Sequence, residues 1–371
     1  MDRKKNIENK KNHIGFFISA LHGGGAERVF VILANEFAER GYIVDLVLIR
    51  KKGPYLKDVM EKVNIIDLNV SGVLKSLFPL IQYLRIKNPD ILISTLNRVN
   101  LVAIAAKIIS HCFVKLIIRQ ANCFTSLSNR KTKLLGRFLY HREDAIVAIS
   151  DGVKKNLMET FKLSEQKIKV IYNPVFRTSI LKDSKKEVDH PFFKEKGYKV
   201  ILGVGRLEKQ KNFSLLIKAF NKVREARKVR LIICGEGKQR EELEDLIQEQ
   251  GLENDISMPG FVDNPYAYMA KADVFVLSSL YEGFGNVLVE AMACGTPVVS
   301  TDCPSGPSEI IEKGKYGKLV PINDINSLAE AILETLDHPL DKMLLQKRAK
   351  YFSVEKSVKK YQDLLNECIE K

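Results

Sequence analysis

The sequence predicts an α/β protein of two domains followed by a helical tail. Short apolar runs alternate with amphipathic helical patterns along almost the whole chain, and this alternation is typical of βαβ units with parallel sheets. Many of the runs are continuously apolar, as expected of strands that are covered on both faces. A polar stretch with little periodicity divides the pattern near the middle of the 371 residues, which indicates two α/β series of similar length.

The predicted elements follow from these runs in chain order. Strand-like segments of the first series include residues 13–19, 43–49, 90–94, 115–118, 145–149 and 169–172. Those of the second series include residues 199–204, 230–234, 255–258, 274–277 and 297–300. Helical patterns lie between them, for example at residues 27–40, 212–227, 239–250 and 286–294.

The domain boundaries are placed at the polar interruption and at the last strand signal. We expect a first domain at 1–174, a linker at 175–198, a second domain at 199–338 and a helical tail at 339–371. Both domains are expected to be Rossmann-like and to face a cleft, where open α/β sheets bind their ligands. The tail offers six candidate packing positions: Leu344, Leu345, Tyr351, Val354, Val358 and Leu365.

Composition excludes several classes of protein. The chain is 45% hydrophobic and 28% charged, so wholesale disorder is excluded. No uncharged apolar run approaches the ~18 residues of a membrane span. The basic N-terminus is followed by a short apolar run that leads into glycines, which favours a first strand over a signal peptide. The six cysteines form no CxxC pair, which favours reduced thiols in a cytosolic protein and no metal site.

The formal charge of +14 is unevenly distributed. Residues 1–170 contain 29 basic and 15 acidic side chains, whereas residues 171–371 contain 30 of each. The whole excess therefore lies in the first half of the chain. Such a basic half indicates an anionic partner, which could be nucleic acid, a phospholipid surface or a phosphorylated small molecule.

The first motif is HGGGAERV, from His22 to Val29, directly after the first predicted strand. Its three glycines allow a sharp turn and a close approach to a ligand. The helix expected to begin near Ala26 would point its free N–H groups at an anion. The same turn also suits a tight βα connection without a ligand. It is not the GxGxxG dinucleotide fingerprint, so NAD binding is not favoured.

The second motif is GRLEKQKNF, which starts at Gly205 after the first strand of the second series. Arg206 would sit at the carboxyl end of that strand, with Lys211 near the start of the next helix. Two cations at a helix N-terminus suit a diphosphate, because charge-assisted bonds to phosphate are strong. A solvated loop is the alternative interpretation.

The third motif, YEGFGNVLVEAMACGTPVVS, carries two acids seven residues apart, Glu282 and Glu290. Gly283 and Gly285 supply a turn with exposed N–H groups, and a helix is expected to start near Asn286. Glu290 would lie just over one turn inside that helix, so both acids can face one pocket. Carboxylates accept hydrogen bonds from sugar or ribose hydroxyls, and the N–H groups suit phosphate. Core packing alone does not explain two acids around such a turn.

Weaker signals surround the same predicted pocket. Glu236 lies in a glycine-rich loop after another strand, and Phe261 and Val262 open the FVDNP loop, where they are either core or base-facing. The loop CPSGPSEII spans residues 303–311. No Ser/His/Asp arrangement and no metal-ligand cluster is apparent, so neither hydrolysis nor a metal centre is expected.

Taken in order, these motifs closely resemble the retaining glycosyltransferases of family 4 (group 1 glycosyltransferases), which have the GT-B fold. The resemblance covers essentially the whole chain and is strongest from Lys199 to Val320. It implies a nucleotide-sugar donor held mainly by the second domain and an acceptor held mainly by the first. It also implies that the last helix returns to the first domain.

The resemblance assigns roles to individual residues. Arg206 and Lys211 clamp the donor diphosphate, Glu282 contacts the donor sugar, and Glu290 contacts the ribose. The other donor-binding residues that it implies are Gly24, Gly25, Gly205, Glu236, Phe261, Val262, Phe284, Gly285, Asn286 and Val287. No metal or other cofactor is implied, because Arg206, Lys211 and helix N-termini would stabilise the leaving diphosphate.

One loop departs from the family pattern. Many relatives have a histidine in the loop after the fourth strand of the first domain, whereas the matching region here reads IIRQANCF. Arg119 and Asn122 are therefore candidates for a contact with the sugar or the acceptor. His22, beside the glycine turn, is a third candidate and is equally compatible with a solvated position.

The predicted function is transfer of a hexose or N-acetylhexosamine from a nucleotide sugar to a growing glycan. The loop at 303–311 resembles enzymes that use UDP-sugars, and the acceptor would be a lipid-linked or surface glycan. One alternative is a GT-B sugar-nucleotide epimerase, which should have more histidine and carboxylate groups near the cleft. The other is a nucleic-acid-binding protein, which lacks support beyond charge, so no nucleic-acid partner is expected.

The predicted function suggests a role for the excess positive charge in the first half of the chain. It would dock on the anionic inner face of the membrane that carries a lipid-linked acceptor, at about 1 kcal/mol per basic residue near the surface. The enzyme would then be cytoplasmic and peripherally associated with that membrane. The residues suited to this contact are Lys75, Arg85, Lys107, Lys115, Arg130, Lys131, Lys133 and Arg137.

Overall fold

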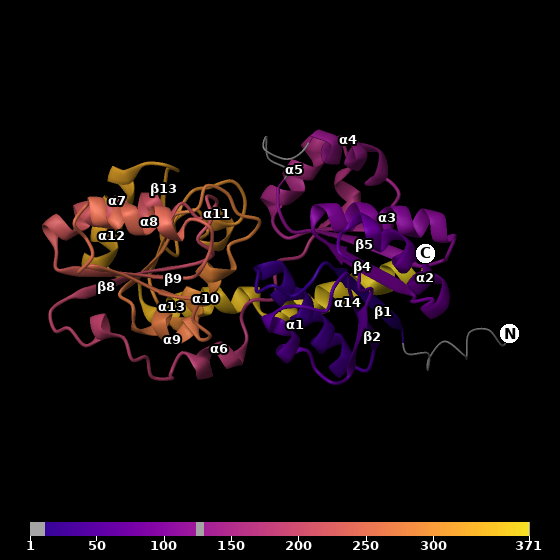
Figure 1. Ribbon diagram of the computed structural model, residues 1–371, viewed down its shortest axis with the longest axis horizontal. Helices are drawn as coiled ribbons and strands as arrows, with labels where there is room; N and C mark the ends of the chain where they lie inside the picture. The colour runs from indigo at the N-terminus through magenta and orange to yellow at the C-terminus, as the bar shows by residue number, and fades with distance from the viewer. Residues whose placement is uncertain (1–11, 124–129, 371) are drawn as a thin grey trace. The chain divides into compact units, whose positions relative to one another are not determined.

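A computed structural model describes residues 12–123 and 130–370, with no side chains for 130–133 (Figure 1). The chain divides into two compact units: unit 1 comprises residues 1–174 and 354–371, and unit 2 comprises residues 175–353. Each unit contains a sheet of parallel strands flanked by helices. The predicted α/β class with two Rossmann-like sheets and a helical tail is confirmed.

In the described part of unit 1, seven parallel strands form a sheet with the order β3-β2-β1-β4-β5-β6-β7. The strands are β1 (His13–Ile18), β2 (Ile43–Leu48), β3 (Val63–Asp67), β4 (Ile91–Thr95), β5 (Lys115–Gln120), β6 (Ala145–Ala148) and β7 (Ile168–Val170). The helices are α1 (Gly25–Glu39), α2 (Leu77–Lys87), α3 (Asn97–Ser110), α4 (Arg130–Leu139) and α5 (Asp151–Phe161), with 3-10 turns η1 (Pro54–Asp58), η2 (Leu74–Ser76) and η3 (Glu165–Lys167).

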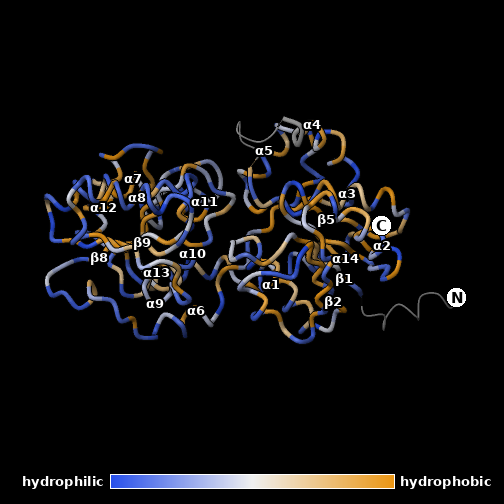
Figure 2. Tube along the Cα trace, in the orientation of Figure 1, coloured by the Kyte–Doolittle hydropathy of each residue, from blue (hydrophilic) through white to orange (hydrophobic). Residues whose placement is uncertain are grey.

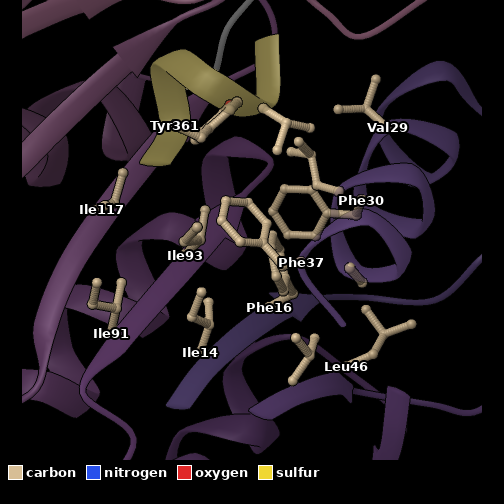
Figure 3. Close-up of a cluster of buried hydrophobic side chains, with 14 of the residues drawn as sticks. Ile14, Phe16, Val29, Phe30, Phe37, Leu46, Ile91, Ile93, Ile117 and Tyr361 are labelled. Carbon is tan, nitrogen blue, oxygen red and sulfur yellow. The ribbon is translucent and has the colours of Figure 1, made fainter. Parts of the chain in front are cut away.

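One face of this sheet is covered by helices from opposite ends of the chain. Phe30 and Phe37 of α1 pack on Phe16 of β1, with ring centroids 5.4 and 6.1 Å apart. Tyr361 of α14 (Val354–Glu370) lies beside this cluster (Figure 3). The spacing Val354, Val358, Tyr361, Leu365 follows the helical repeat, so one stripe of α14 is buried in unit 1.

In the described part of unit 2, six parallel strands have the order β10-β9-β8-β11-β12-β13. They are β8 (Lys199–Val204), β9 (Val229–Cys234), β10 (Ile256–Gly260), β11 (Val274–Leu277), β12 (Val298–Thr301) and β13 (Lys318–Val320). The helices are α6 (Thr178–Asp183), α7 (Phe213–Ala226), α8 (Arg240–Glu249), α9 (Pro265–Lys271), α10 (Asn286–Cys294), α11 (Pro307–Ile310), α12 (Ile325–Asp337) and α13 (Lys342–Ala349), with η4 (Pro191–Phe193) and η5 (Lys350–Phe352). The strands of both sheets are strongly hydrophobic (Figure 2).

The structure corrects several sequence-based expectations. Strands β3 and β13 were missed, because each is short and the apolar run of each is interrupted or partly exposed. The segment 175–198 is not a free linker: α6 packs on α9 and α10, and the imidazole of His190 is 3.1 Å from the Ser257 hydroxyl. Leu344 and Tyr351, proposed as packing positions, are exposed.

A buried acid in unit 1 gives a pH-dependent prediction. The Glu143 side chain, between α4 and β6, is fully buried, and neither oxygen has a hydrogen-bond partner in another residue. Burial raises its pKa to about 7, although the Lys167 ammonium lies 3.9 Å away. Because an unfolded glutamate titrates near ~4.3, the folded protein holds the extra proton, and its stability falls as pH rises from ~4.3 to about 7.

We therefore predict that Glu143→Gln stabilises the protein by about 2 kcal/mol at pH 8 and by much less at pH 5. Thermal unfolding of both proteins at the two pH values measures the difference. Glu159→Gln, at an exposed position of α5, is the control and should be neutral at both. An equal gain at pH 5 and pH 8 would show that the proton is not involved.

Candidate active site

The residues predicted to hold the donor lie at one edge of the sheet of unit 2. Because the strands are parallel, the loops that follow β8, β9, β10, β11 and β12 all emerge at the carboxyl edge. These loops contain the GRLEKQKNF, CGEG, FVDNP, YEGFG and CPSG sequences. Parallel open sheets bind ligands at this edge.

Backbone hydrogen bonds join three of these loops. The Gly205 N–H donates to Cys234 O at 3.0 Å, Leu207 N–H to Glu236 O at 2.9 Å, and Gly235 N–H to Gly260 O at 2.8 Å. Gly235 has φ +150°, and a Cβ there would overlap the Gly205 carbonyl. Only glycine therefore allows this close approach of the loops.

A buried ion pair lies at the centre of the edge. The Lys211 ammonium is 2.5 Å from Glu282 Oε1, and the two side chains are 13% and 9% exposed. The Ser279 hydroxyl donates to the same oxygen at 2.7 Å, and Ser279 is fully buried. The spacing of the motifs predicted both charged residues but not their pairing, which joins the start of α7 to the loop after β11.

Ser279 is a positioning residue for Glu282, since it holds one carboxylate oxygen from within the protein. We predict that Ser279→Ala lowers kcat/KM for the sugar donor about tenfold, because a hydrogen bond to a charged group contributes about 1.5–3 kcal/mol. Ser279→Thr keeps the hydroxyl and should retain most activity. The control is Ser300→Ala, at another fully buried serine whose hydroxyl donates to the Thr301 carbonyl. Equal losses in the two alanine variants would contradict the assigned role.

The turn before α10 is held by the 303–306 loop. Ser305 Oγ donates to Gly283 O at 2.9 Å, and a Cβ on Gly306 (φ +89°) would overlap the Phe284 carbonyl. The Phe284 ring is buried against Phe352, with centroids 5.4 Å apart, so only its backbone can face a ligand. Helix α10 starts at Asn286 as predicted, with Gly285 as N-cap at φ +101°.

The second acid of the motif has its own hydrogen-bond chain. Tyr266 Oη donates to Glu290 Oε1 at 3.3 Å, and the Arg177 guanidinium donates to Tyr266 Oη at 2.9 Å. Glu290 is buried, like Glu282. Tyr266 and Arg177 were not predicted from the sequence. The FVDNP motif just before α9 was the available signal for Tyr266, whereas Arg177 lay in the presumed linker.

The other predicted donor residues are more exposed. The Arg206 side chain is exposed, Val287 and Val262 are half-buried, and Phe261 is 59% exposed. Glu236 accepts two hydrogen bonds from Arg240, at 2.7 and 2.8 Å, so its carboxylate is already paired. Buried Cys303 was not predicted to belong to the site. Burial, and to a smaller extent the negative charge of Glu282, raises the pKa of its thiol to about 12.

In unit 1 the glycine turn lies at the carboxyl end of β1. His22 and Gly25 are exposed, and Gly24, half-buried, is the N-cap of α1, which begins one residue before the predicted start. The Tyr55 hydroxyl donates to Gly23 O at 3.1 Å, and the Arg28 guanidinium lies over the Tyr55 ring. The sequence offered no signal for Tyr55, which comes from η1.

The expectation that Arg119 contacts the sugar or the acceptor is wrong. Arg119 is 1% exposed at the end of β5 and donates to Thr95 Oγ1 at 3.0 Å and to Asn173 Oδ1 at 2.6 Å. It also interacts with Tyr361 of α14, and burial lowers its pKa. A fully buried guanidinium engaged in this way cannot reach a solvent-borne ligand. Asn122 is exposed, and its carbonyl accepts a hydrogen bond from Gln120.

Comparison with known proteins identifies the family of the chain. The family model for glycosyl transferases group 1 matches residues 184–352, and the model for glycosyltransferase family 4 matches residues 23–176. An N-acetylgalactosaminyltransferase of Campylobacter jejuni that acts on a diphospho-undecaprenol-linked saccharide is 32% identical, over 87% of this chain and 90% of its own. The chain belongs to the glycosyltransferases of this family. The glycosyltransferase is also 29% identical to a lipopolysaccharide core biosynthesis enzyme of Rhizobium meliloti, over 83% of this chain and 84% of that enzyme.

Solved structures show the same GT-B fold for the glycosyltransferase. A glycosyltransferase of Rickettsia africae superimposes with a TM-score of 0.82 at 19% identity, covering 98% of this chain and all of the other. Anabaena HepE in complex with UDP and glucose superimposes with a TM-score of 0.81 at 22% identity, covering 96% and 100%. The predicted family, fold and enzyme class are confirmed. Among the described residues, no helix is long and apolar enough to cross a bilayer.

Proposed function

We propose that the enzyme transfers a hexose or N-acetylhexosamine from a UDP-sugar to a lipid-linked or surface-glycan acceptor, with retention of the anomeric configuration. The observation that carries the proposal is the buried Lys211–Glu282 pair beside the Gly283–Gly285 turn. The Campylobacter relative, whose acceptor is linked to undecaprenol diphosphate, and the UDP-bound Anabaena structure support the choice of substrates. Membership of the family favours transfer over the epimerase and nucleic-acid-binding alternatives.

In this proposal unit 2 binds the donor and unit 1 the acceptor. The bond between sugar C1 and the diphosphate oxygen breaks, and the acceptor hydroxyl attacks from the face that the diphosphate leaves. The hydroxyl proton passes to the departing phosphate oxygen. Lys211 and Arg206 stabilise the negative charge on UDP, and the positive end of the α10 helix dipole contributes to this stabilisation.

Glu282 orients the donor sugar, since the Lys211 ammonium and the Ser279 hydroxyl hold only its Oε1. Glu290 accepts from the ribose, with Tyr266 setting its position. The roles predicted for Gly24, Gly25, Glu236, Phe261 and Val262 stay predictions. We also propose that transfer needs no metal ion, because two cationic side chains meet the charge of the diphosphate. Undiminished turnover in EDTA is the expected result.

Donor choice can be tested by thermal shift with UDP-, GDP- and ADP-sugars, because a bound donor raises the melting temperature by mass action. We expect the melting temperature to rise only with UDP-sugars, and we expect this rise to be much smaller for the Lys211→Ala protein. Transfer to an undecaprenol-diphosphate-linked saccharide, followed by NMR of the new anomeric proton, then tests acceptor and retention. A response confined to GDP- or ADP-sugars, or an inverted product, would contradict the proposal.

We also propose that the enzyme meets its acceptor at the inner face of the membrane by peripheral contact of unit 1. The excess positive charge of residues 1–170 supports this location. Of the residues predicted to make the contact, Lys107 is paired with Asp144, and Lys115 lies 3.9 Å from the same acid. The side chains of Arg130, Lys131 and Lys133 lie outside the described residues.

A further inference from the structure

One continuous segment of unit 1 is almost free of negative charge. Residues 68–142, which include α2, α3 and α4, contain a single acid, Asp90, whose carboxylate accepts a hydrogen bond from the His13 N–H at 2.8 Å. The same segment contains twelve basic residues: Lys75, Arg85, Lys87, Arg98, Lys107, Lys115, Arg119, Arg130, Lys131, Lys133, Arg137 and Arg142. Helices α2 and α3 carry no acidic residue at all.

Large apolar side chains protrude from this basic layer. Phe113, in the turn between α3 and β5, is 98% exposed, and Ile86, near the end of α2, is 79% exposed. Four further apolar residues at or beside these two helices are also exposed, and we call the set of six the α2–α3 patch: Leu74, Phe78, Ile86, Ile108, Ile109 and Phe113. Single exposed apolar residues are common on protein surfaces, but a group of this kind marks a binding surface.

The two helices hold the patch together. They pack side by side in unit 1 (Figure 1), and the Arg85 guanidinium donates to the Ile109 and Ser110 carbonyls at 3.4 Å. These bonds join the C-terminal ends of α2 and α3, where Ile86 and Ile109 lie. Lys87 and His111 are exposed at the same ends, and Lys75 lies at the other end of α2. Apolar and cationic groups thus share one surface.

We propose that the α2–α3 patch is the surface that inserts into an anionic lipid bilayer, with Phe113 and Ile86 entering the acyl boundary and Arg85, Lys87 and Lys75 binding lipid phosphates. The chemistry of a bilayer interface matches both features, because it offers apolar chains beneath negative headgroups. A second copy of this chain fits poorly, since pairing the patch with itself would oppose like charges. The inference refines the membrane contact proposed above and is independent of the sugar chemistry.

The chain contains no tryptophan, so one substitution can report insertion directly. Phe113→Trp creates the sole tryptophan of the protein at the most exposed point of the patch. When vesicles of 70% phosphatidylcholine and 30% phosphatidylglycerol are added, its emission should shift to shorter wavelength. The emission should also be quenched when the vesicles contain brominated lipid. Met343→Trp is the matched control, at a 77% exposed position of α13 in unit 2, and should show neither effect.

Binding constants for the same vesicles test each component of the patch. Phe113→Ser should weaken binding about tenfold or more, since it removes the apolar ring that insertion would bury. Lys87→Glu should also weaken it about tenfold and reduce its salt dependence, because a charge is reversed at the surface. Met343→Ser and Lys359→Glu, exposed but outside the patch, are the controls.

Three results would each overturn the inference. The first is unchanged tryptophan emission when the Phe113→Trp protein is bound to vesicles, and the second is binding to pure phosphatidylcholine vesicles as tight as to the anionic ones. The third is a blue shift of the emission that occurs without vesicles and increases with protein concentration. The last would identify a self-association surface. UDP release from UDP-sugars in detergent, measured on the same variants, separates this inference from the proposed function. Normal turnover without insertion refutes only the patch, and insertion without turnover on any UDP-sugar refutes only the proposed chemistry.

Discussion

Replacing Lys211 by alanine should lower kcat for sugar transfer by about 10²–10³-fold. The ammonium group lies 2.5 Å from Glu282 in a largely buried site, where a preorganised positive charge stabilises the departing diphosphate far more than it would in water. Loss of one such group typically costs about 3–4 kcal/mol of transition-state stabilisation. Steady-state UDP release, with the donor selected by thermal shift, measures the change.

Lys211→Ala also removes the ion-pair partner of the buried Glu282 carboxylate, so the stability of the variant must be measured together with its activity. Lys209→Ala, at an exposed position of the same loop, is the matched control and should stay active. Glu282→Gln should also be inactive in transfer, although it keeps a side chain able to accept from Ser279. Near-normal kcat in both Lys211→Ala and Glu282→Gln would refute the assignment of the site.

Arg119→Met should destabilise unit 1 by about 3 kcal/mol without directly removing a ligand contact. The variant keeps much of the side-chain volume but leaves Asn173 and Thr95 without their buried donor, and breaking a buried charged network costs about 3–5 kcal/mol. Burial of the charged guanidinium, which lowers the pKa of Arg119, costs free energy in the wild-type protein. The variant no longer has this cost, which offsets part of the loss. Urea unfolding of the two proteins measures the difference.

Arg142→Met, at an exposed position in the same unit, is the control and should change stability by less than about 0.5 kcal/mol. KM for the donor should be unchanged in folded Arg119→Met, because the residue lies in unit 1 and is buried. A stable variant with a raised KM for the acceptor would restore the contact role that the structure contradicts.

Sequence reasoning was most successful in unit 2, where local pattern and tertiary structure agree. Strands β8 and β11 and helix α10 have the predicted bounds, because each ends where its hydrophobic pattern meets a glycine or a pair of serines. The pairing of side chains across the site could not be predicted, since Lys211 and Glu282 are 71 residues apart and no periodicity links them. Glu236 shows the same limit: its glycine-rich loop and the family resemblance suggested a donor contact, but its pairing with Arg240, one helical turn later, was not predicted.

Unit 1 was harder to predict, because its key contacts join distant segments. Arg119 follows an apolar strand and looks from the sequence like a charged residue entering a loop. In the folded protein it is buried and interacts with Asn173 and Tyr361, which lie 54 and 242 positions further along. A basic residue in a loop motif therefore cannot be assigned to a ligand from local sequence alone.

The placement of α14 in unit 1 has a consequence for how the protein is made. Unit 2 is one uninterrupted segment, residues 175–353, whereas unit 1 needs residues 354–371 to cover its sheet. Unit 2 can therefore complete its contacts from one continuous segment, whereas the hydrophobic face around Phe16 and Phe30 stays uncovered until Val358, Tyr361 and Leu365 have been made and can pack onto it. Unit 1, whose first segment precedes unit 2 in the chain, is completed only after it, so a chain that stops before α14 should leave that face open to aggregation and to chaperones.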